Sequence, residues 1–181
     1  MATAKDIIKQ GLSLVYETPV TDADANRFSY GVLQMLVADC FDAENNSRED
    51  DDQLESIPII GGSGDVDGDG EVTAADASLI LRSLNGLNTL TEEQRTNADV
   101  NGDGVITQAD STAILENLVG LNDLLERHTI PYNYYLTTVA LPCGVAWKWC
   151  EANGRADDAL MYHQLYEESK HIGGRGKWNL K

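Results

Sequence analysis

The chain has 181 residues, 42% of them hydrophobic, and a formal net charge of −17 at pH 7. This hydrophobic content predicts a folded protein rather than a disordered one, and the length suits one medium domain or two small ones. The acidic balance excludes an ordinary nucleic-acid groove, which needs a basic face, and favours divalent cations or a basic partner. The sequence has no run of 18 apolar residues and no apolar leader in its first ten residues. We therefore expect a protein that is neither in a membrane nor exported by the usual signal.

The first sixty residues predict helices followed by a polar loop. Thr3 and Asp6 have the spacing of a capping box, which opens a helix ending near Tyr16. A second helix is expected from Thr21 or Asp22, and its core face should hold Ala25, Phe28, Val32, Met35, Leu36 and Cys40. Residues 45–53 are too polar to pack, which predicts a loop or a short exposed helix. Residues 57–60 form a short extended apolar run closed by two glycines.

A repeat fills the centre of the chain. A shift of 34 residues gives 14 identities in the 24 positions from residue 65 to residue 88. Each repeat predicts a loop followed by a helix, and one such unit cannot bury its apolar face alone. Two units related by a local two-fold axis can do so. The expected core positions are Ile80, Leu81, Leu84 and Leu87 in the first helix and Ile114, Leu115, Leu118 and Leu121 in the second.

Each repeat begins with a twelve-residue acidic loop of the EF-hand type. Calcium takes six to eight oxygen ligands, and such a loop supplies them from positions 1, 3, 5, 7, 9 and 12. The predicted ligands are Asp65, Asp67, Asp69, the Glu71 carbonyl, Thr73 and Asp76 in the first loop, and Asp99, Asn101, Asp103, the Val105 carbonyl, Thr107 and Asp110 in the second. The sequence therefore predicts two calcium ions that fold the module. The alternative is two Asp/Gly-rich turns without metal, which the match at every ligand position in both loops disfavours.

Other loop positions support the same prediction. Gly70 and Gly104 occupy position 6, where the sharp turn favours positive φ. Val72 and Ile106 occupy position 8 and are expected to pair across the two loops. Position 12 is Asp in both loops rather than the usual Glu, and no amphipathic helix enters the first loop.

In both departures from the EF-hand, the repeats resemble dockerin modules. The paired loop-helix repeats of dockerins dock onto cohesin domains in plant-fibre-degrading bacterial complexes. The resemblance covers residues 64–122. It implies that the partner is contacted mainly through positions 10 and 11 of each loop, which here are Ala74, Ala75, Gln108 and Ala109.

The last third of the chain again predicts helices. Residues 129–132 should be extended, because a residue before proline avoids the helical region. An apolar helix is expected from about Tyr134 to Glu151, and Pro142 either kinks it or starts its main segment. Asn153 and Gly154 should end it, and Asp157 or Asp158 should open a last helix to about His171. The glycine-rich basic residues 173–181 are expected to form an extended arm.

The reactive side chains form no catalytic pattern in the sequence, so we expect no enzymatic activity. Three cysteines without metal or CxxC spacing are expected to be buried free thiols rather than a disulfide, namely Cys40, Cys143 and Cys150. Three scattered histidines are expected to face solvent, namely His128, His163 and His171. Trp147 and Trp149 are expected to pack between helices or subunits.

Short motifs in both flanks resemble tailed-phage head–tail connector (adaptor) proteins. The motifs are Ile57-Pro58, Leu121-Asn-Asp-Leu124, Ile130-Pro-Tyr132, Ala140-Leu-Pro-Cys-Gly144, Tyr166-Glu-Glu168 and the opening DIIK run. Cys143 stands where that family usually has an aromatic residue. The resemblance implies a mainly α fold, in which residues 1–62 and 121–172 form a discontinuous helical connector-type domain with a short strand pair. Residues 63–120 would be a dockerin-like calcium-binding insertion, followed by the arm at residues 173–181.

The connector resemblance implies a virion structural protein of the neck region that is made in the host cytoplasm. It would form a homo-oligomeric ring beneath the portal and contact the portal and neighbouring tail proteins. The module would offer a site for a cohesin-like domain. The alternative is a dockerin-bearing accessory protein that docks onto a cohesin scaffold in a calcium-dependent way, which the internal position of the module and the missing export signal disfavour. A third hypothesis is a cytoplasmic calcium-stabilised binding protein.

Overall fold

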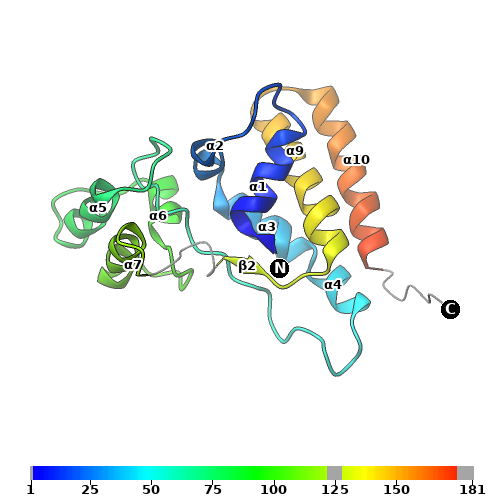
Figure 1. Cartoon of the computed structure of the whole chain (residues 1–181), viewed down its shortest axis with the longest axis horizontal. Helices are drawn as coiled ribbons and strands as arrows, with labels where there is room; N and C mark the ends of the chain where they lie inside the picture. Colours follow the sequence, from blue (N-terminus) through cyan, green and yellow to red (C-terminus); the bar gives the residue numbers. More distant parts are fainter. Residues whose placement is uncertain (1, 122–127, 175–181) are drawn as a thin grey trace.

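The computed structural model describes residues 2–121 and 128–174, which form a helical domain and a smaller central module beside it (Figure 1). The helical domain contains β1 (Ala2–Thr3), α1 (Ala4–Ser13), α2 (Asp22–Arg27), α3 (Tyr30–Asp39), α4 (Phe41–Ser47), β2 (Thr129–Ile130), the π-helix η1 (Leu136–Ala140), α9 (Leu141–Ala152) and α10 (Ala156–Gly173). The central module contains α5 (Ala74–Leu84), α6 (Glu92–Ala98) and α7 (Gln108–Leu118). The predicted mainly α fold is confirmed. Within the described ranges, no helix has the length and apolar character needed to cross a membrane.

The two flanks of the chain meet in the small sheet. β1 and β2 pair antiparallel, with Ala2 opposite Ile130 and Thr3 opposite Thr129. A strand pair was expected, but residues 57–60 do not belong to it, and β2 pairs with the N-terminal residues instead. The amide of Ile60 instead donates to the Gln34 side chain at 2.6 Å. The sheet places the start of the chain beside the point where it returns from the module, so both flanks contribute to one core.

The helix expected from Thr21 to Cys40 is in fact two helices. Phe28 is extended, with ψ 136°, and ends α2, while the Ser29 hydroxyl accepts from the Val32 amide and caps α3. The break rotates the second half of the predicted face. Met35 is therefore exposed rather than buried, and the residues of α3 that enter the core are Tyr30, Leu33, Leu36 and Val37.

The C-terminal helices start and end close to the predicted residues. Pro142 lies in the first turn of α9, where a missing amide hydrogen is tolerated, and the preceding turn is the π-helix η1. Gly154 adopts φ 71° and ends α9 with Asn153 as its cap. The final residues 175–181, and residues 122–124 of the predicted acidic turn, lie outside the described part of the chain.

The cysteines of the helical domain are buried as predicted, whereas one histidine predicted to face solvent is buried. Cys40, Cys143 and Cys150 are buried free thiols, and burial raises the pKa of Cys40 to about 11. His128 is buried rather than solvent-facing, because its ring packs edge-on against Tyr30 and its Nε2 lies 3.3 Å from a backbone carbonyl of the module. The other two histidines are less enclosed. His163 is half-buried and stacked on Trp147, and His171 is exposed.

The contact between α1 and α9 leaves no room for a side chain at Gly11. A Cβ there would lie 2.5 Å from Cβ of Val145 and 2.7 Å from the Pro142 carbonyl oxygen. We expect Gly11→Ala to lower the free energy of unfolding by about 1–3 kcal/mol, because overpacking outweighs the better helix propensity of alanine. Urea unfolding monitored by circular dichroism measures this. The neighbouring exposed Gln10→Ala is the control, and an equal effect of the two variants would contradict the packing argument.

The central module has a small core of its own. Eight buried hydrophobic residues form it, namely Val66, Ala77, Ile80, Leu90, Ala98, Val100, Ala113 and Ile114. Ile80 and Ile114 are buried as predicted. Five of the other predicted core positions are 42–80% exposed, namely Leu84, Leu87, Leu115, Leu118 and Leu121. The prediction for these five is wrong because the core of the module takes only Ala77 and Ile80 from α5 and Ala113 and Ile114 from α7, so these five side chains face outward.

Candidate metal centre

The first acidic loop is organised by the carboxylates at its two ends. Asp65 is fully buried and accepts the amides of Gly68 and Gly70 at 2.8 and 2.9 Å. Asp76 is also fully buried and accepts the amides of Val66, Asp67 and Thr73 at 2.7, 3.1 and 2.8 Å. These bonds wrap the loop backbone around the two carboxylates, and the two bonds to Asp65 leave further lone pairs of that carboxylate free to bind a cation.

Three of the predicted ligands in the first loop converge. Asp65, Asp67 and Asp76 each offer a carboxylate oxygen, and these oxygens lie within 4.8 Å of one another. The carboxylate of Asp69 accepts the Glu71 amide at 2.7 Å, which places it in the same loop but outside this cluster. Thr73 donates its hydroxyl to Asp76 at 3.2 Å and caps α5. The donor set is entirely oxygen, which suits a hard cation such as calcium.

The second loop repeats this arrangement with less enclosure. Asp99 accepts the amides of Gly102 and Gly104 at 2.9 and 2.8 Å, and the buried Asp110 accepts the amides of Asn101 and Thr107 at 3.4 and 2.8 Å. The remaining predicted ligands are exposed or half-buried, namely Asn101, Asp103, Val105 and Thr107. The position-3 side chain is an amide here, so the second loop carries one carboxylate fewer than the first.

Glycines allow both loops to turn. Gly70 and Gly104 have φ of 97° and 83°, in the left-handed region that a side chain rarely adopts. Val72 and Ile106, the two position-8 residues, both pack against the core cluster of the module. The two loops are therefore joined through the same small core.

The electrostatics of the first loop favour a bound cation. Burial raises the pKa of Asp65, and the neighbouring Asp76 and Asp69 raise it further, although the amides of Gly70 and Gly68 oppose this. A raised folded-state pKa gives stability that is present at low pH and is lost as the pH rises through that pKa. Without a cation, the buried negative charge of Asp65 therefore disfavours the folded loop at neutral pH. A calcium ion would supply the positive charge that neutralises these carboxylates, held by the loop oxygens named above.

Comparison with known proteins agrees with this geometry. Residues 63–119 match the family model described as the Dockerin type I domain. The chain carries a dockerin module. Dockerin type I domains bind calcium and dock onto cohesin partners. The match covers the two loops and the helices α5, α6 and α7, and it does not bear on the flanking segments. No significant match was found among curated proteins or among solved structures.

The structure also places residues at the first loop of the dockerin module that the loop spacing did not predict. Asn97, at the end of α6, donates its side-chain amide to the Asp65 carbonyl at 2.9 Å. Two residues of α2, in the helical domain, donate to carbonyls of the same loop. Asn26 reaches Gly70 at 3.0 Å, and Arg27 reaches Asp69. No sequence signal marks these three residues, because they lie 32 to 44 positions from the residues they contact.

Proposed function

We propose that the protein is a calcium-dependent docking protein, in which a rigid helical domain carries a dockerin module that binds two calcium ions and a cohesin-like partner. The family match and the oxygen-lined loops support this proposal. Calcium here has a structural role, because the eight-residue core of the module is too small to hold the two repeats together alone.

The observation that carries the proposal is an apolar surface on the module. α5 and α7 pack together and leave outward-facing apolar residues in both repeats, namely Leu84 and Leu87 in the first and Leu115, Leu118, Val119 and Leu121 in the second. Positions 10 and 11 of both loops are also exposed, at Ala74, Ala75, Gln108 and Ala109. Large apolar side chains exposed on two packed helices favour protein–protein contact.

We expect the double variant Leu84→Asp and Leu118→Asp to weaken cohesin binding by about 10- to 100-fold, because buried apolar anchors dominate interface energy. Isothermal titration calorimetry with type I cohesin domains, in calcium and in EDTA, measures the effect. The control is Leu165→Asp, which changes a leucine on α10 in the helical domain that is exposed to a similar degree. Binding that is equally strong in EDTA, or that the double variant leaves unchanged, would contradict the proposal.

For the helical domain, we infer the role of a head–tail connector subunit of a virion. Several motifs that resemble the connector family lie where the segments of this domain pack together or where a helix starts. Tyr132 donates its hydroxyl to the Val37 carbonyl at 2.7 Å, Pro142 starts α9, and Tyr166 of α10 is fully buried in the core. These positions support a single folded unit into which the dockerin module is inserted.

A connector subunit would assemble head-to-tail into a closed ring beneath the portal, in the neck of the particle. The outward face of α10 supports such contacts because it carries four exposed apolar residues, namely Leu160, Met161, Leu165 and Ile172. In this role the protein would be made in the host cytoplasm and would contact the portal and neighbouring tail proteins. The dockerin module would project from the ring.

Immunoblotting across a density gradient of lysate from the source culture tests the connector role. Antigen that bands with DNA-filled particles is the expected result. Antigen that is absent from particles and found with extracellular fibre-degrading complexes would contradict the connector role. It would instead favour an accessory protein of a cohesin scaffold, and calcium-dependent docking would remain the function of the module.

A further inference from the structure

The two calcium loops differ in their contact with the helical domain. The first loop touches α2, and a Cβ on Gly70 would lie 2.9 Å from both Cβ of Ala23 and Cζ of Arg27. A Cβ on Gly104, the equivalent glycine of the second loop, would meet no atom within 4 Å. Figure 1 shows α2 on the side of the helical domain that faces the module. The repeat therefore supplies its own comparison, because α2 contacts the position-6 glycine of the first loop and no atom takes the same place at the position-6 glycine of the second.

Two side chains of α2 hold the first loop by its backbone. Asn26 donates from Nδ2 to the Gly70 carbonyl at 3.0 Å, and Arg27 donates from Nη2 to the Asp69 carbonyl. These carbonyls belong to positions 5 and 6, directly before the Glu71 carbonyl that is the predicted position-7 ligand. Fixing these two peptide groups restricts the part of the loop that must turn sharply to bring its ligands together.

The environment of Asn26 makes this contact energetically important. Asn26 is 5% exposed, and its Oδ1 has no hydrogen-bond partner within the described residues. The bond to Gly70 is therefore the hydrogen bond that compensates the burial of its amide group. A buried amide that loses its partner bears the full cost of desolvation. If the first loop changed conformation, α2 would be left with such a group, so the state of the loop and the packing of α2 are linked.

We propose that Asn26 and Arg27 are positioning residues for the first calcium site and that they couple calcium binding there to the seating of the module on the helical domain. This inference rests on the proposed function, since it assumes calcium in the loops. Coupling of this kind is reciprocal: the contact that favours calcium is itself favoured by calcium to the same degree. The second loop contacts the flanking segments at other positions: the Asp99 carbonyl accepts the Gly62 amide at 2.6 Å, and the Val100 carbonyl lies 3.3 Å from Nε2 of His128. These are positions 1 and 2 of the loop, so no residue of α2 fixes its turn at positions 5 and 6 within the described residues.

Asn26 is the better residue for a test, because the positive charge of Arg27 also repels calcium and so has two opposing effects. Two-dimensional ¹H–¹⁵N NMR of the full chain follows the Gly70 and Gly104 amides separately during one calcium titration. Both amides donate to the position-1 carboxylate of their own loop, so they are equivalent reporters. Neither site has to be removed.

The expected result for Asn26→Ala is a calcium midpoint at Gly70 that rises about 3- to 10-fold, as the loss of one hydrogen bond predicts, with little change at Gly104. Lys9→Ala is the matched control. This substitution removes the 2.7 Å ion pair between Lys9 and Asp22 of α2 but changes no hydrogen bond to either loop. It should therefore leave the calcium midpoints at Gly70 and Gly104 unchanged. An unchanged midpoint at Gly70, or an equal shift at Gly104, would overturn the proposal.

A second measurement needs no substitution and so does not depend on the variant folding. In the wild-type protein, the side-chain amide signal of Asn26 should change with the same calcium midpoint as the Gly70 amide. An Asn26 signal that is insensitive to calcium would overturn the coupling. If neither glycine responds to calcium in the wild-type protein, the proposed calcium-dependent function fails as well.

Discussion

Chelation of calcium with EDTA is expected to unfold the dockerin module and leave the helical domain folded. The module has eight buried hydrophobic residues, and two of its loops are built around buried carboxylates. Without a cation these carboxylates repel one another in an environment of low polarity. The helical domain has a separate and larger core, to which α1, α3, α9 and α10 contribute.

Hydrogen–deuterium exchange measured by mass spectrometry distinguishes the two regions. In EDTA, peptides covering α5 and α7 should lose protection by several orders of magnitude, whereas peptides from α1 and α9 should keep it. Return of calcium should restore the protection of α5 and α7. Magnesium in place of calcium serves as the control, since its smaller octahedral shell suits such a loop poorly. Unchanged protection of α5 and α7 in EDTA would show that the module folds without its metals.

The second large effect is expected from Glu44→Ala in the helical domain. Glu44 is 2% exposed and joins α4 to the segment after β2. Its carboxylate accepts from Arg48 Nε and from the Asn133 amide, both at 2.7 Å, and Arg48 also donates to the Pro131 carbonyl at 2.5 Å. Removing one partner of a buried charged network leaves the others uncompensated, so we expect a loss of about 3–5 kcal/mol in the free energy of unfolding.

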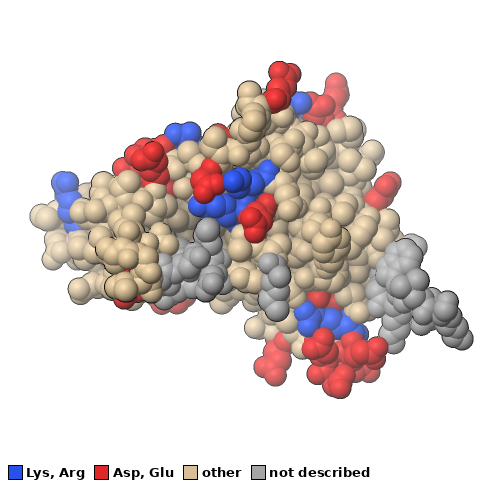
Figure 2. Space-filling model, in the orientation of Figure 1, with Lys and Arg blue, Asp and Glu red and all other residues tan. Residues whose placement is uncertain are grey.

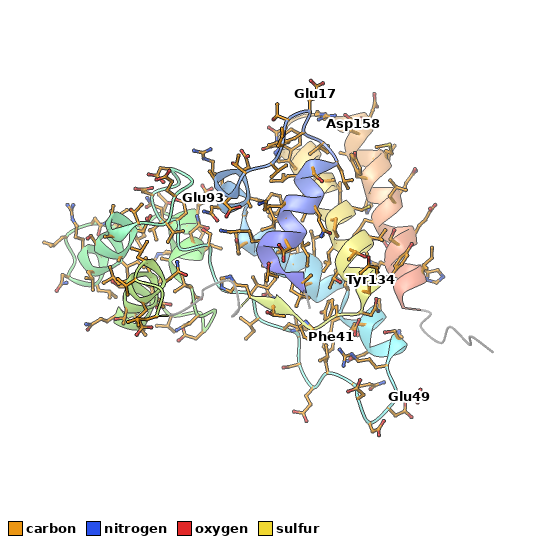
Figure 3. All side chains as sticks on the ribbon, in the orientation of Figure 1. Glu17, Phe41, Glu49, Glu93, Tyr134 and Asp158 are labelled. Atoms are coloured by element: carbon orange, nitrogen blue, oxygen red, sulfur yellow. The ribbon has the colours of Figure 1, made fainter. Side chains whose placement is uncertain are left out.

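Asp52, a second partner of the same arginine, provides the matched control. Arg48 also pairs with Asp52 at 3.3 Å, but the Asp52 side chain is 77% exposed. Figure 3 labels Glu49 on the same loop, which projects from the domain beyond α4, and Figure 2 shows acidic side chains gathered there. Asp52→Ala should therefore change stability by less than about 1 kcal/mol. Urea unfolding of both variants tests this. Equal effects of the two substitutions would refute the buried-network argument.

The features that the sequence predicts well depend on neighbouring residues. The capping box of Thr3 and Asp6 is present, Gly154 with positive φ follows the cap of α9, and the acidic loops wrap around their first and last carboxylates. Each of these is specified within about twelve residues, so a spacing in the sequence contains the necessary information. Helix starts and loop ligands are therefore determined by residues that are close in the sequence.

The features that the sequence predicted wrongly depend on contacts between distant residues. His128 was expected at the surface, but it is enclosed between Tyr30 and the module. The outward leucines of α5 and α7 have the periodicity of a core face, and the pattern alone does not reveal that the small core of the module leaves them uncovered. β2 pairs with the N-terminus rather than with residues 57–60, a choice between two short apolar runs that register patterns do not decide.

The attachment of the first calcium loop to α2 was likewise invisible in the sequence. Asn26 and Arg27 lie on a six-residue helix in a region without any calcium motif. Only the folded arrangement places α2 beside the loop, and it does so for one of two loops whose sequences are nearly the same. The asymmetry between the two sites is a property of the inserted position of the module, not of the repeat.

Native mass spectrometry of the full chain, titrated with calcium, tests the central claim most directly. The proposed function predicts a species with two bound calcium ions, reduced to one ion when either Asp65→Ala or Asp99→Ala removes the first ligand of one loop. A chain that binds no calcium, or one whose bound calcium is unaffected by both substitutions, would contradict the assignment of the two loops as calcium sites.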